Sequence, residues 1–460
     1  MKPSLWLYHH LPPVAWSVAA SLRAWQLSGR RFGSIFAEAV PQIVRRTGAP
    51  AAELRAYQAE RLAMLLTEAA ASIPAYRGLP VPTAPGDALE TLARWPLLDL
   101  GRLRANPADY CHPMRARGAV IRLFTSGTTG TPKQIVRDAE AEQLNYAYSE
   151  ARWKLTAGVD RNDRWAMIGG QLVVPAARRR PPFWVRAWPL HQLYLSSYHL
   201  APEHAEAYMR ALAGWRPAYL LGYASSLDQL AAFSESTGIR LRPRAVISNA
   251  EPLYAHVRER LARVFGCAVR DTYGSTEGAL QAFECAQGRL HVSTDFGVFE
   301  ILTPEGAPAP PGVPGRVVVT GLTNRAMPLV RYEIGDTATW AAPEPCPCGS
   351  SFPVLAAVEG RTDDLLLLPD GRRIGRLDPV FKGGLPIREA QIVQRRDGSI
   401  DVRIATEERA GIAWTEAHER QLLRELRARL GDSIAIRFER VERVERSANG
   451  KFKAVVRERA

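Results

Sequence analysis

FTSGTTGTPK occupies residues 124–133 and follows an apolar run at residues 119–123 that is typical of a strand. Gly127 and Gly130 allow the backbone to turn tightly enough to aim N–H groups at an anion. The hydroxyl groups between them add donors, and Lys133 adds a positive charge. The segment predicts a loop that binds the phosphates of a nucleotide. Its expected contact residues are Thr125, Ser126, Gly127, Thr128, Thr129, Gly130 and Lys133.

This loop is not a Walker A sequence. A Walker A loop has four residues between its glycines and an unbroken Gly-Lys-Ser/Thr, whereas Thr131 and Pro132 separate Gly130 from the lysine here. The alternative is a Ser/Thr/Gly-rich surface turn without a ligand. Only six of the 60 basic residues are lysines, so a lysine in this turn favours the phosphate-binding interpretation.

The composition is that of a globular protein. The chain has 460 residues, of which 46% are hydrophobic and 23% charged, enough for two or three domains with their own cores. The net charge of +13 comes from arginines spread along the chain, so we expect polyanionic small substrates and no nucleic acid. Residues 11–22 are short and contain two prolines, which fits neither a transmembrane segment nor a secretion signal. We therefore expect a cytoplasmic protein, and a homodimer stays open.

Apolar periodicity predicts an α/β fold. Residues 50–72 have helical spacing, and from residue 118 extended and helical runs alternate, which favours a largely parallel sheet with crossover helices. The expected strands are 119–124, 165–168, 218–221, 245–247 and 268–272. The expected helices are 138–153, 202–213, 227–237 and 255–265.

The pattern changes near residue 297. Runs 298–302 and 316–320 flank a Pro/Gly-rich stretch, which predicts a hairpin or a small barrel. Farther on, residues 391–405 alternate like a strand, 415–430 are helical, and 434–442 are again extended. We expect an N-terminal domain of residues 1–360, with a helical lead-in to residue 115 and a β-rich subdomain from about 297. A small mobile α+β domain of residues 361–460 would follow.

Three further segments carry candidate chemistry. DTYGSTEG at 271–278 ends a strand, and Glu277 could hold magnesium near phosphates, although a solvated glutamate in a turn is the plainer interpretation. RYEIGD at 331–336 places Asp336 after a glycine, where it could accept the hydroxyls of a ribose or form an Asx turn. RSANGKFK at 446–453 puts Lys451 on a glycine-hinged loop that could reach a site elsewhere, or on a basic surface tail.

Cysteine and histidine residues form a separate candidate site. Cys285 and His291 are separated by five residues, and Cys346 and Cys348 belong to a CPCG turn. Three thiols and one imidazole suit a tetrahedral structural zinc site, although Cys-x-Cys is tighter than the usual spacing. The alternative is a set of ordinary reduced cysteines, which we also expect for Cys111 and Cys267.

Five segments, FTSGTTGTPK, DTYGSTEG, RYEIGD, the charged GRTDD at 360–364 and RSANGKFK, occur in an order that resembles the acyl-adenylate-forming enzymes. That superfamily includes acyl-CoA synthetases, peptide-synthetase adenylation domains and luciferases. The resemblance is strongest to the phenylacetate-CoA ligase-like branch with its capsule-biosynthesis-associated members. Five segments carry it: PPFW at 181–184, LYLSSYHL at 193–200, LGYASSL at 221–227, ISNAEPL at 247–253 and EAQIVQ at 389–394. The resemblance covers the chain from about residue 50. Some members of the branch also resemble this chain in having cysteines and a histidine that match the candidate zinc site.

The resemblance implies a role for each matching residue. Residues 126–133 would hold the β- and γ-phosphates of ATP, Glu277 the Mg²⁺, Asp336 and Arg361 the ribose, and Lys451 would be catalytic. The charged segment GRTDD at 360–364 would contain the hinge, Asp363. The residues implied to flank the adenine and the acyl group are Ser248, Asn249, Ala250, Glu251, Asp271, Thr272, Tyr273 and Gly274, with Gly169, Gly170 and Tyr223 in the acyl pocket.

The implied function is that of an acid-thiol ligase. Such an enzyme joins a carboxylic acid, here expected to be aryl or arylacetic, to AMP and then passes the acyl group to coenzyme A. One alternative is transfer to an amine, hydroxyl or carrier protein in polysaccharide or natural-product assembly. Another is a non-catalytic relative that acts at a membrane surface or in assembly, but the presence of Lys133, Glu277, Asp336 and Lys451 together argues against it.

Overall fold

The structure is a computed structural model that describes most of the chain. The described residues are 8, 10–125, 133–175, 178–361, 366–368, 373–374, 385–406, 414–430, 434–445, 453 and 455–458. The chain divides into two compact units. The first contains Met1–Ile334 and Ala338–Val358, and the second contains Gly335–Thr337 and Glu359–Ala460.

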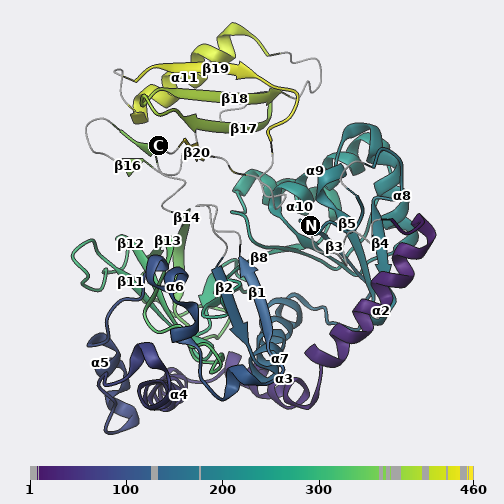
Figure 1. Ribbon diagram of the computed structural model, residues 1–460. Coiled ribbons are helices and arrows are strands. Elements are labelled where there is room, and N and C mark those ends of the chain that lie inside the picture. The colour runs from purple at the N-terminus through teal and green to yellow at the C-terminus, as the bar shows by residue number, and fades with distance from the viewer. Residues whose placement is uncertain are drawn as a thin grey trace. The chain divides into compact units, whose positions relative to one another are not determined.

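A twelve-stranded mixed sheet forms the centre of the first unit, in the order β11-β12-β13-β14-β10-β9-β8-β7-β6-β3-β5-β4 (Figure 1). Its first six strands in chain order are β3 (Trp165–Gly169), β4 (Trp184–Ala187), β5 (Gln192–Ser196), β6 (Tyr219–Gly222), β7 (Ala245–Ser248) and β8 (Ala268–Gly274). The others are β9 (Gln281–Glu284), β10 (Leu290–Val292), β11 (Gly297–Leu302), β12 (Pro314–Gly321), β13 (Tyr332–Trp340) and β14 (Val354–Arg361).

Strands β5, β3, β6, β7 and β8 pair in parallel, as the alternating pattern predicted. Crossover helices α8 (Ala205–Trp215), α9 (Ala224–Thr237) and α10 (Ala255–Phe265) connect β5 to β6, β6 to β7 and β7 to β8. Every residue of β6 and β7 is buried, because helices and neighbouring elements cover both faces of a parallel sheet. The apolar pattern did not predict β5 or the antiparallel edge strand β4.

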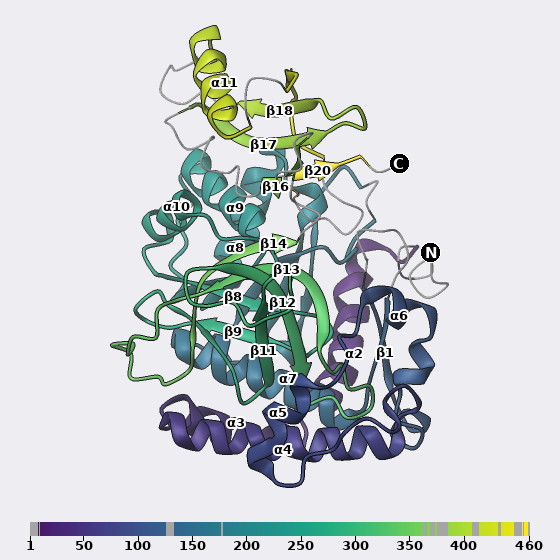
Figure 2. The same cartoon turned by 90° about the vertical axis from the view of Figure 1, so that its left-hand side faces the viewer.

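The remaining strands of the sheet are mostly antiparallel. Strand β9 pairs antiparallel with β8 and β10, and β11 pairs antiparallel with β12 over residues 297–302 and 316–321. Figure 2 shows this green part of the sheet face on. The expectation of a hairpin or a small barrel at 298–320 is therefore resolved as a hairpin within the large sheet.

The N-terminal part is helical, with α2 (Pro13–Arg31), α3 (Ser34–Thr47), α4 (Ala51–Ser72), α5 (Ala88–Ala93) and α6 (Leu100–Ala105). Leu62, Leu66 and Ala69 of α4 pack in one core with residues of β12 and β13. The expected helix at 138–153 is α7 (Ala139–Ser149), extended by one π-helical turn at Glu150–Lys154.

One strand prediction was wrong in its pairing. Residues 119–124 were expected in the parallel sheet, but β1 (Ile121–Thr125) pairs antiparallel with β2 (Lys133–Arg137) in a sheet of two strands. Thr125 and Lys133 are the last paired residues, so residues 126–132 connect the two ends of this hairpin.

The second unit contains a four-stranded sheet of order β19-β18-β17-β20 and helix α11 (Glu416–Leu430). Its strands are β17 (Ile387–Gln394), β18 (Ile400–Thr406), β19 (Ile436–Arg440) and β20 (Val455–Arg457), and β15 (Leu366–Leu367) pairs with β16 (Arg373–Ile374). The single strand expected at 391–405 is two strands, because Gly398 takes a φ of +83° in the turn between them. Leu422 and Leu426 of α11 share a core with Ile392 and Val402.

Candidate functional site

The parallel strands bring two predicted segments together. In the register of the sheet, Ile168 lies beside Gly222, Gly222 beside Ser248, and Ser248 beside Asp271. The carboxyl ends of β3, β6, β7 and β8 therefore meet at one edge. Ligands of open α/β sheets bind outside this edge. Residues 248–251 and 271–274, which sequence reasoning placed near the adenine and the acyl group, both lie here.

Hydrogen bonds fix the backbone at this edge. Thr272 Oγ1 donates to the carbonyl oxygen of Ser248 at 2.8 Å. The Glu251 carboxylate accepts from the backbone N–H of Ser225 in the first turn of α9 at 3.0 Å. Ala250 has a φ of +62°, a left-handed conformation that side-chain-bearing residues seldom adopt. Strain of this kind concentrates at ligand sites.

The carboxyl edge of the sheet continues at the segments that follow β3, β5 and β6. The Tyr223 hydroxyl accepts from the backbone N–H of Gly170 at 3.3 Å, and the Tyr198 hydroxyl donates to the Gly170 carbonyl oxygen at 3.0 Å. A side chain at Gly169 would place its Cβ 2.8 Å from the Tyr194 hydroxyl oxygen. The residues assigned to an acyl pocket thus form one bonded group with tyrosines that the sequence did not single out.

Three polar atoms at the same edge are buried without a partner among the described residues. They are Ser248 Oγ, Asn249 Oδ1 and Ser275 Oγ. Leaving such an atom unsatisfied costs about 1–3 kcal/mol, so native proteins rarely do so without a ligand, ion or water. A hydroxyl, an amide oxygen and a second hydroxyl offer both donors and acceptors, as a heterocyclic base and a ribose require. This set fits a bound nucleotide.

Asp271 has an unusual environment. Burial and the neighbouring Glu284 carboxylate raise the pKa of Asp271 from 3.8 to about 7, while the Thr272 N–H and Arg258 oppose that shift. Glu284 accepts from the Asp271 backbone N–H at 2.6 Å and pairs with Arg258 at 2.9 Å. Sequence reasoning missed Glu284 and Arg258, since neither belongs to a recognisable motif.

Glu277 is buried and lies among polar side chains. Its Oε1 is 3.5 Å from the Tyr332 hydroxyl, and its charge acts on Arg137. Arg137 is itself buried, donates to the Thr276 carbonyl oxygen and pairs with Glu142 at 3.4 Å. Burial lowers the pKa of Arg137, and the carboxylates of Glu142 and Glu277 oppose that change. The carboxylate of Glu277 therefore lies between β13 and β2, and is not a solvated turn residue.

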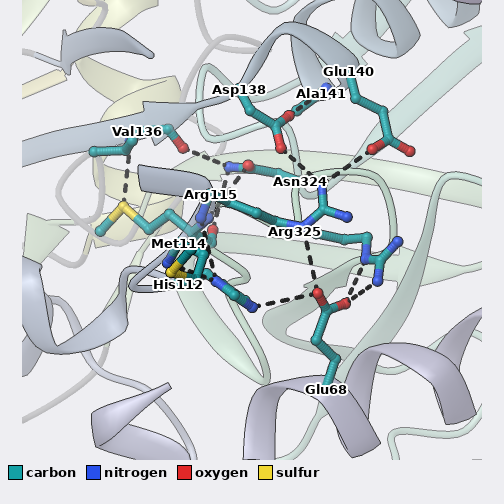
Figure 3. A network of polar contacts seen from close by, with 11 residues as sticks. Glu68, His112, Met114, Arg115, Val136, Asp138, Glu140, Ala141, Asn324 and Arg325 are labelled. Carbon is teal, nitrogen blue, oxygen red and sulfur yellow. Dashed lines mark hydrogen bonds and ion pairs between the residues drawn. The ribbon is translucent and has the colours of Figure 1, made fainter. Parts of the chain in front are cut away.

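The β1–β2 hairpin is tied to three other elements by a polar network (Figure 3). Arg115 bonds to Glu68 of α4 at 3.3 Å, to Asp138 at 3.0 Å and to Glu140 at 3.1 Å. Arg325 also pairs with Glu68. Because Asp138 follows β2 directly, this network fixes the base of the hairpin that carries the predicted phosphate loop.

An amide completes this anchor. Asn324 Nδ2 donates to the carbonyl oxygens of Val136 at 2.9 Å and Met327 at 3.2 Å (Figure 3). Asn324 is buried, so one side chain satisfies two backbone groups that water does not reach. No sequence pattern pointed to this role, because Val136 is 188 residues away along the chain.

The cysteine and histidine candidates lie together. The ligand atoms of Cys285, His291, Cys346 and Cys348 are all within 4.8 Å of one another. Cys285 Sγ is 3.8 Å from Cys346 Sγ, and Cys348 Sγ is 3.4 Å from His291 Nε2. Two sulfurs bound tetrahedrally at the Zn–S distance of about 2.3 Å are about 3.8 Å apart. His291 Nδ1 lies 2.8 Å from the Phe352 carbonyl oxygen, which leaves Nε2 to face the thiols.

Other candidates are placed in part or not at all. Asp336 is half-buried in β13 after Gly335, whose φ is +87°, and Arg361 is the last residue of β14. Residues 126–132, the hinge candidate Asp363 and the lysine candidate Lys451 lie outside the described residues, as do the side chains of Thr125, Lys133 and Arg361.

The described part of the chain contains no helix with the length and apolar character needed to cross a bilayer. Cys111 and Cys267 are partly exposed and lie outside the cluster formed by Cys285, His291, Cys346 and Cys348.

Comparisons with known proteins agree with this geometry. The sequence profile of the AMP-binding enzyme family matches residues 55–325, and that of the CapK C-terminal domain matches residues 366–458. Protein CapK of Staphylococcus aureus is 29% identical over 254 residues, which are 55% of this chain and 55% of CapK. A phenylacetate-coenzyme A ligase of Thermus thermophilus is 32% identical over 162 residues, 34% of this chain and 36% of that ligase.

These two matches therefore span about half or less of the relatives' own length. Among solved structures, 2-hydroxyisobutyryl-CoA ligase in complex with R3-HIB-AMP has a TM-score of 0.69 at 20% identity, covering 90% of this chain and 92% of that one. This likeness concerns the fold. The chain belongs to the family of AMP-binding enzymes, within the acyl-adenylate-forming superfamily, and resembles its phenylacetate-CoA ligase-like branch with a CapK-type C-terminal domain.

Proposed function

We propose that this protein activates a carboxylic acid as its acyl-AMP and then transfers the acyl group to coenzyme A. In the first step a carboxylate oxygen bonds to the α-phosphorus of ATP and the bond to the pyrophosphate oxygen breaks. In the second step the thiol sulfur bonds to the acyl carbon, AMP leaves and a proton is released. The observation that carries the proposal is a group of polar atoms at the carboxyl edge that are buried without a partner among the described residues, namely Ser248 Oγ, Asn249 Oδ1 and Ser275 Oγ.

The first step brings two anions together, so the site has to offset their repulsion. Residues 126–133 would hold the β- and γ-phosphates, and the buried carboxylate of Glu277 would hold Mg²⁺. The ion supplies positive charge against pyrophosphate. Lys451 would approach the α-phosphate and the acid, adding a donor that acts on the transition state. Asp336, with Arg361, would bind the ribose hydroxyls.

The second step needs other neighbours around the acyl-AMP. We propose that Asp363 is a hinge and that residues 361–460 turn relative to residues 1–360 between the two steps, since enzymes use such motions to assemble a site in stages. The names of the matched ligases favour coenzyme A as the acceptor, and phenylacetate in one of them favours an aryl or arylacetic acid.

A second acceptor class has its own support. The C-terminal residues 366–458 match the CapK C-terminal domain, and protein CapK of Staphylococcus aureus is 29% identical over 254 residues. We therefore keep transfer to an amine, a hydroxyl or a carrier protein in polysaccharide or natural-product assembly as the alternative. A non-catalytic relative is the third interpretation.

The four-residue cluster of Cys285, His291, Cys346 and Cys348 fits a structural Zn²⁺ site. The spacing of its sulfurs suits a tetrahedral ion, and four protein ligands leave no position for water or substrate. Bound there, the ion would link the β9–β10 hairpin to the segment between β13 and β14. Its contribution would be to stability and not to the reaction.

Pyrophosphate release tests the main proposal. The purified full chain is supplied with ATP, Mg²⁺ and one acid at a time from a panel of aryl, arylacetic, fatty and amino acids, with and without coenzyme A. Release that depends on the acid supports adenylation, and a thioester seen by mass spectrometry supports the acceptor. Acyl-AMP without a thioester favours the alternative acceptors. No release across the panel contradicts the enzyme proposal and favours the non-catalytic interpretation.

A further inference from the structure

Helix α2 has an apolar face that is exposed in the described part of the chain. Val14, Val18, Leu22 and Trp25 are 84%, 53%, 65% and 71% exposed. They recur at i, i+4, i+8 and i+11, the spacing of one helix face. We call these four residues the α2 stripe. Single exposed apolar side chains are ordinary on protein surfaces, but four in line on one helix mark an interaction surface.

The opposite face of α2 packs against strands β4 and β5 and so fixes the position of the helix. Trp16 and Ala24 are buried, and Trp16 packs with Val185 of β4 and Tyr194 of β5. Ser17 Oγ accepts from the Arg186 backbone N–H at 3.1 Å, and Ser21 Oγ donates to the Arg186 carbonyl oxygen at 3.2 Å. Helix α2 thereby covers the edge strand β4, as Figure 1 shows. Among the described residues of the first unit, none buries the four side chains of the α2 stripe.

The surroundings of the α2 stripe are positively charged. No Asp or Glu occurs at residues 10–37 or 164–202, which include α2, β4 and β5. Arg178, Arg179 and Arg180 line a pocket together with Leu11, Pro13 and Trp16 at the start of α2. Arg186 of β4 is exposed beside α2, and its backbone bonds to Ser17 and Ser21, whereas Arg30 and Arg31 are paired with Glu142.

A second tryptophan lies on the same side. Trp188 follows β4, is 49% exposed, and its backbone N–H donates to Ser21 Oγ of α2 at 3.3 Å. Trp188 thus lies beside Ser21, which is one helical turn before Trp25. Tryptophan is enriched where protein meets the boundary between lipid headgroups and acyl chains, because its ring is amphipathic.

We infer that the α2 stripe and its arginines dock the protein on an anionic lipid bilayer. An apolar helix face with tryptophan, flanked by arginines and free of acids, is the pattern of a helix that lies in the interface plane. The apolar side chains enter the headgroup region, and the arginines bind lipid phosphates. A second copy of the chain fits less well, because two-fold contact of this face with itself would set the same arginines against each other.

Vesicle co-sedimentation tests the inference on the full chain. Vesicles of equal parts phosphatidylglycerol and phosphatidylcholine are compared with pure phosphatidylcholine at low and high salt. We expect binding to the anionic vesicles that weakens with salt, and little binding to the neutral ones. The double variant Leu22→Gln/Trp25→Ser should bind at least about tenfold more weakly, since it removes much of the inserted apolar surface.

Two further variants make the test specific. Arg179→Ala/Arg180→Ala should reduce binding by about fivefold per arginine, the equivalent of about 1 kcal/mol each near an anionic surface. Val81→Ser/Leu89→Gln is the matched control, because these residues are 48% and 46% exposed but lie outside the α2 stripe. It should bind as the unchanged protein does. Thermal melts confirm that each variant is folded.

Three outcomes would overturn the inference. The first is equal binding to neutral and anionic vesicles, and the second is unchanged binding by the α2 stripe variant. The third is the absence of vesicle binding by the unchanged protein, combined with a different complex that depends on the α2 stripe. Sedimentation velocity would then show a dimer, or a complex with an acidic protein, that the Leu22→Gln/Trp25→Ser variant no longer forms. Pyrophosphate release is measured in parallel without vesicles, so a failure of docking is distinguished from a failure of the proposed reaction.

Discussion

Thr272 Oγ1 donates a hydrogen bond of 2.8 Å to the backbone carbonyl oxygen of Ser248, which joins the carboxyl ends of β8 and β7. Both residues are buried, and Ser248 Oγ is one of the polar atoms without a partner among the described residues. The bond therefore holds in place a group that we propose to contact the nucleotide.

Replacing Thr272 by valine should weaken both stability and nucleotide binding. Valine has nearly the same shape as threonine but lacks its hydroxyl group. The Ser248 carbonyl oxygen would lose this hydrogen bond, which should lower the free energy of unfolding by about 1–3 kcal/mol. We expect a lower melting temperature and a raised KM for ATP in pyrophosphate release. Thr272→Ser keeps the donor and is the control. Equal melting temperatures for all three proteins would contradict this account.

Asp271 should make stability depend on pH. Its pKa is raised from 3.8 to about 7 by burial and by Glu284, so the folded state binds the proton more tightly than the unfolded state does. The unfolded state therefore loses its proton first, and the contribution of this group to stability falls as pH rises from about 4 to about 7. Relative to Asp271→Asn, the unchanged protein should lose about 1–4 kcal/mol over this window. Urea unfolding at pH 5 and pH 8 measures the difference, and parallel pH profiles would refute it.

Asp295 should be critical for folding. Its Oδ2 lies 2.9 Å from Arg46 Nε and 3.0 Å from Arg152 Nη2, and the Asp295 and Arg152 side chains have no exposed surface. Asp295→Ala leaves two buried guanidinium groups without their carboxylate and should cost about 3–5 kcal/mol. The Arg210–Glu206 pair is 72% and 64% exposed, so Glu206→Ala should cost less than about 1 kcal/mol. Denaturant unfolding of both variants provides the comparison.

The protein should contain about one equivalent of zinc per chain when purified without chelators. Cys346→Ser should lower that content and the melting temperature together, because it removes one of four ligands. Cys267→Ser, outside the cluster, should change neither. Elemental analysis well below half an equivalent in the unchanged protein would remove the zinc proposal.

Lys451→Ala should reduce acid-dependent pyrophosphate release by about 10²–10³-fold, the scale of losing one preorganised donor at the reacting phosphate. Lys453→Ala is the control, since its backbone carbonyl accepts from Gln391 Nε2 at 2.9 Å and the substitution leaves that bond in place. A loss of the same size in both variants would indicate a general charge effect instead of a catalytic lysine.

Local sequence pattern predicted most of the regular structure. Helix α4 and the alternating strands and helices from β6 to β8 follow from apolar spacing, because each buries a face of fixed period. The pattern failed for residues 119–124, whose apolar character fits a parallel strand as well as a hairpin. It also failed at 391–405, where the turn at Gly398 interrupts a run of otherwise alternating residues.

Sequence motifs likewise predicted some residues of the candidate site and not others. Ser248, Asp271 and Glu277 stood out because each belongs to a short motif at or just after the end of a strand. Glu284, Arg258, Arg115 and Asn324 did not, because no short motif records the contacts that these side chains make.

The sequence by itself determined most of the order of helices and strands, the prediction of a phosphate loop at residues 124–133, and the residue types of the cysteine and histidine cluster, because backbone propensity and side-chain chemistry are local properties. Only the tertiary structure decided that Cys285 meets Cys346, that Ser248 lies beside Asp271, and that one face of α2 covers β4 while the other remains exposed. These outcomes depend on which apolar faces pack together over long separations, and the chain settles that only when it folds.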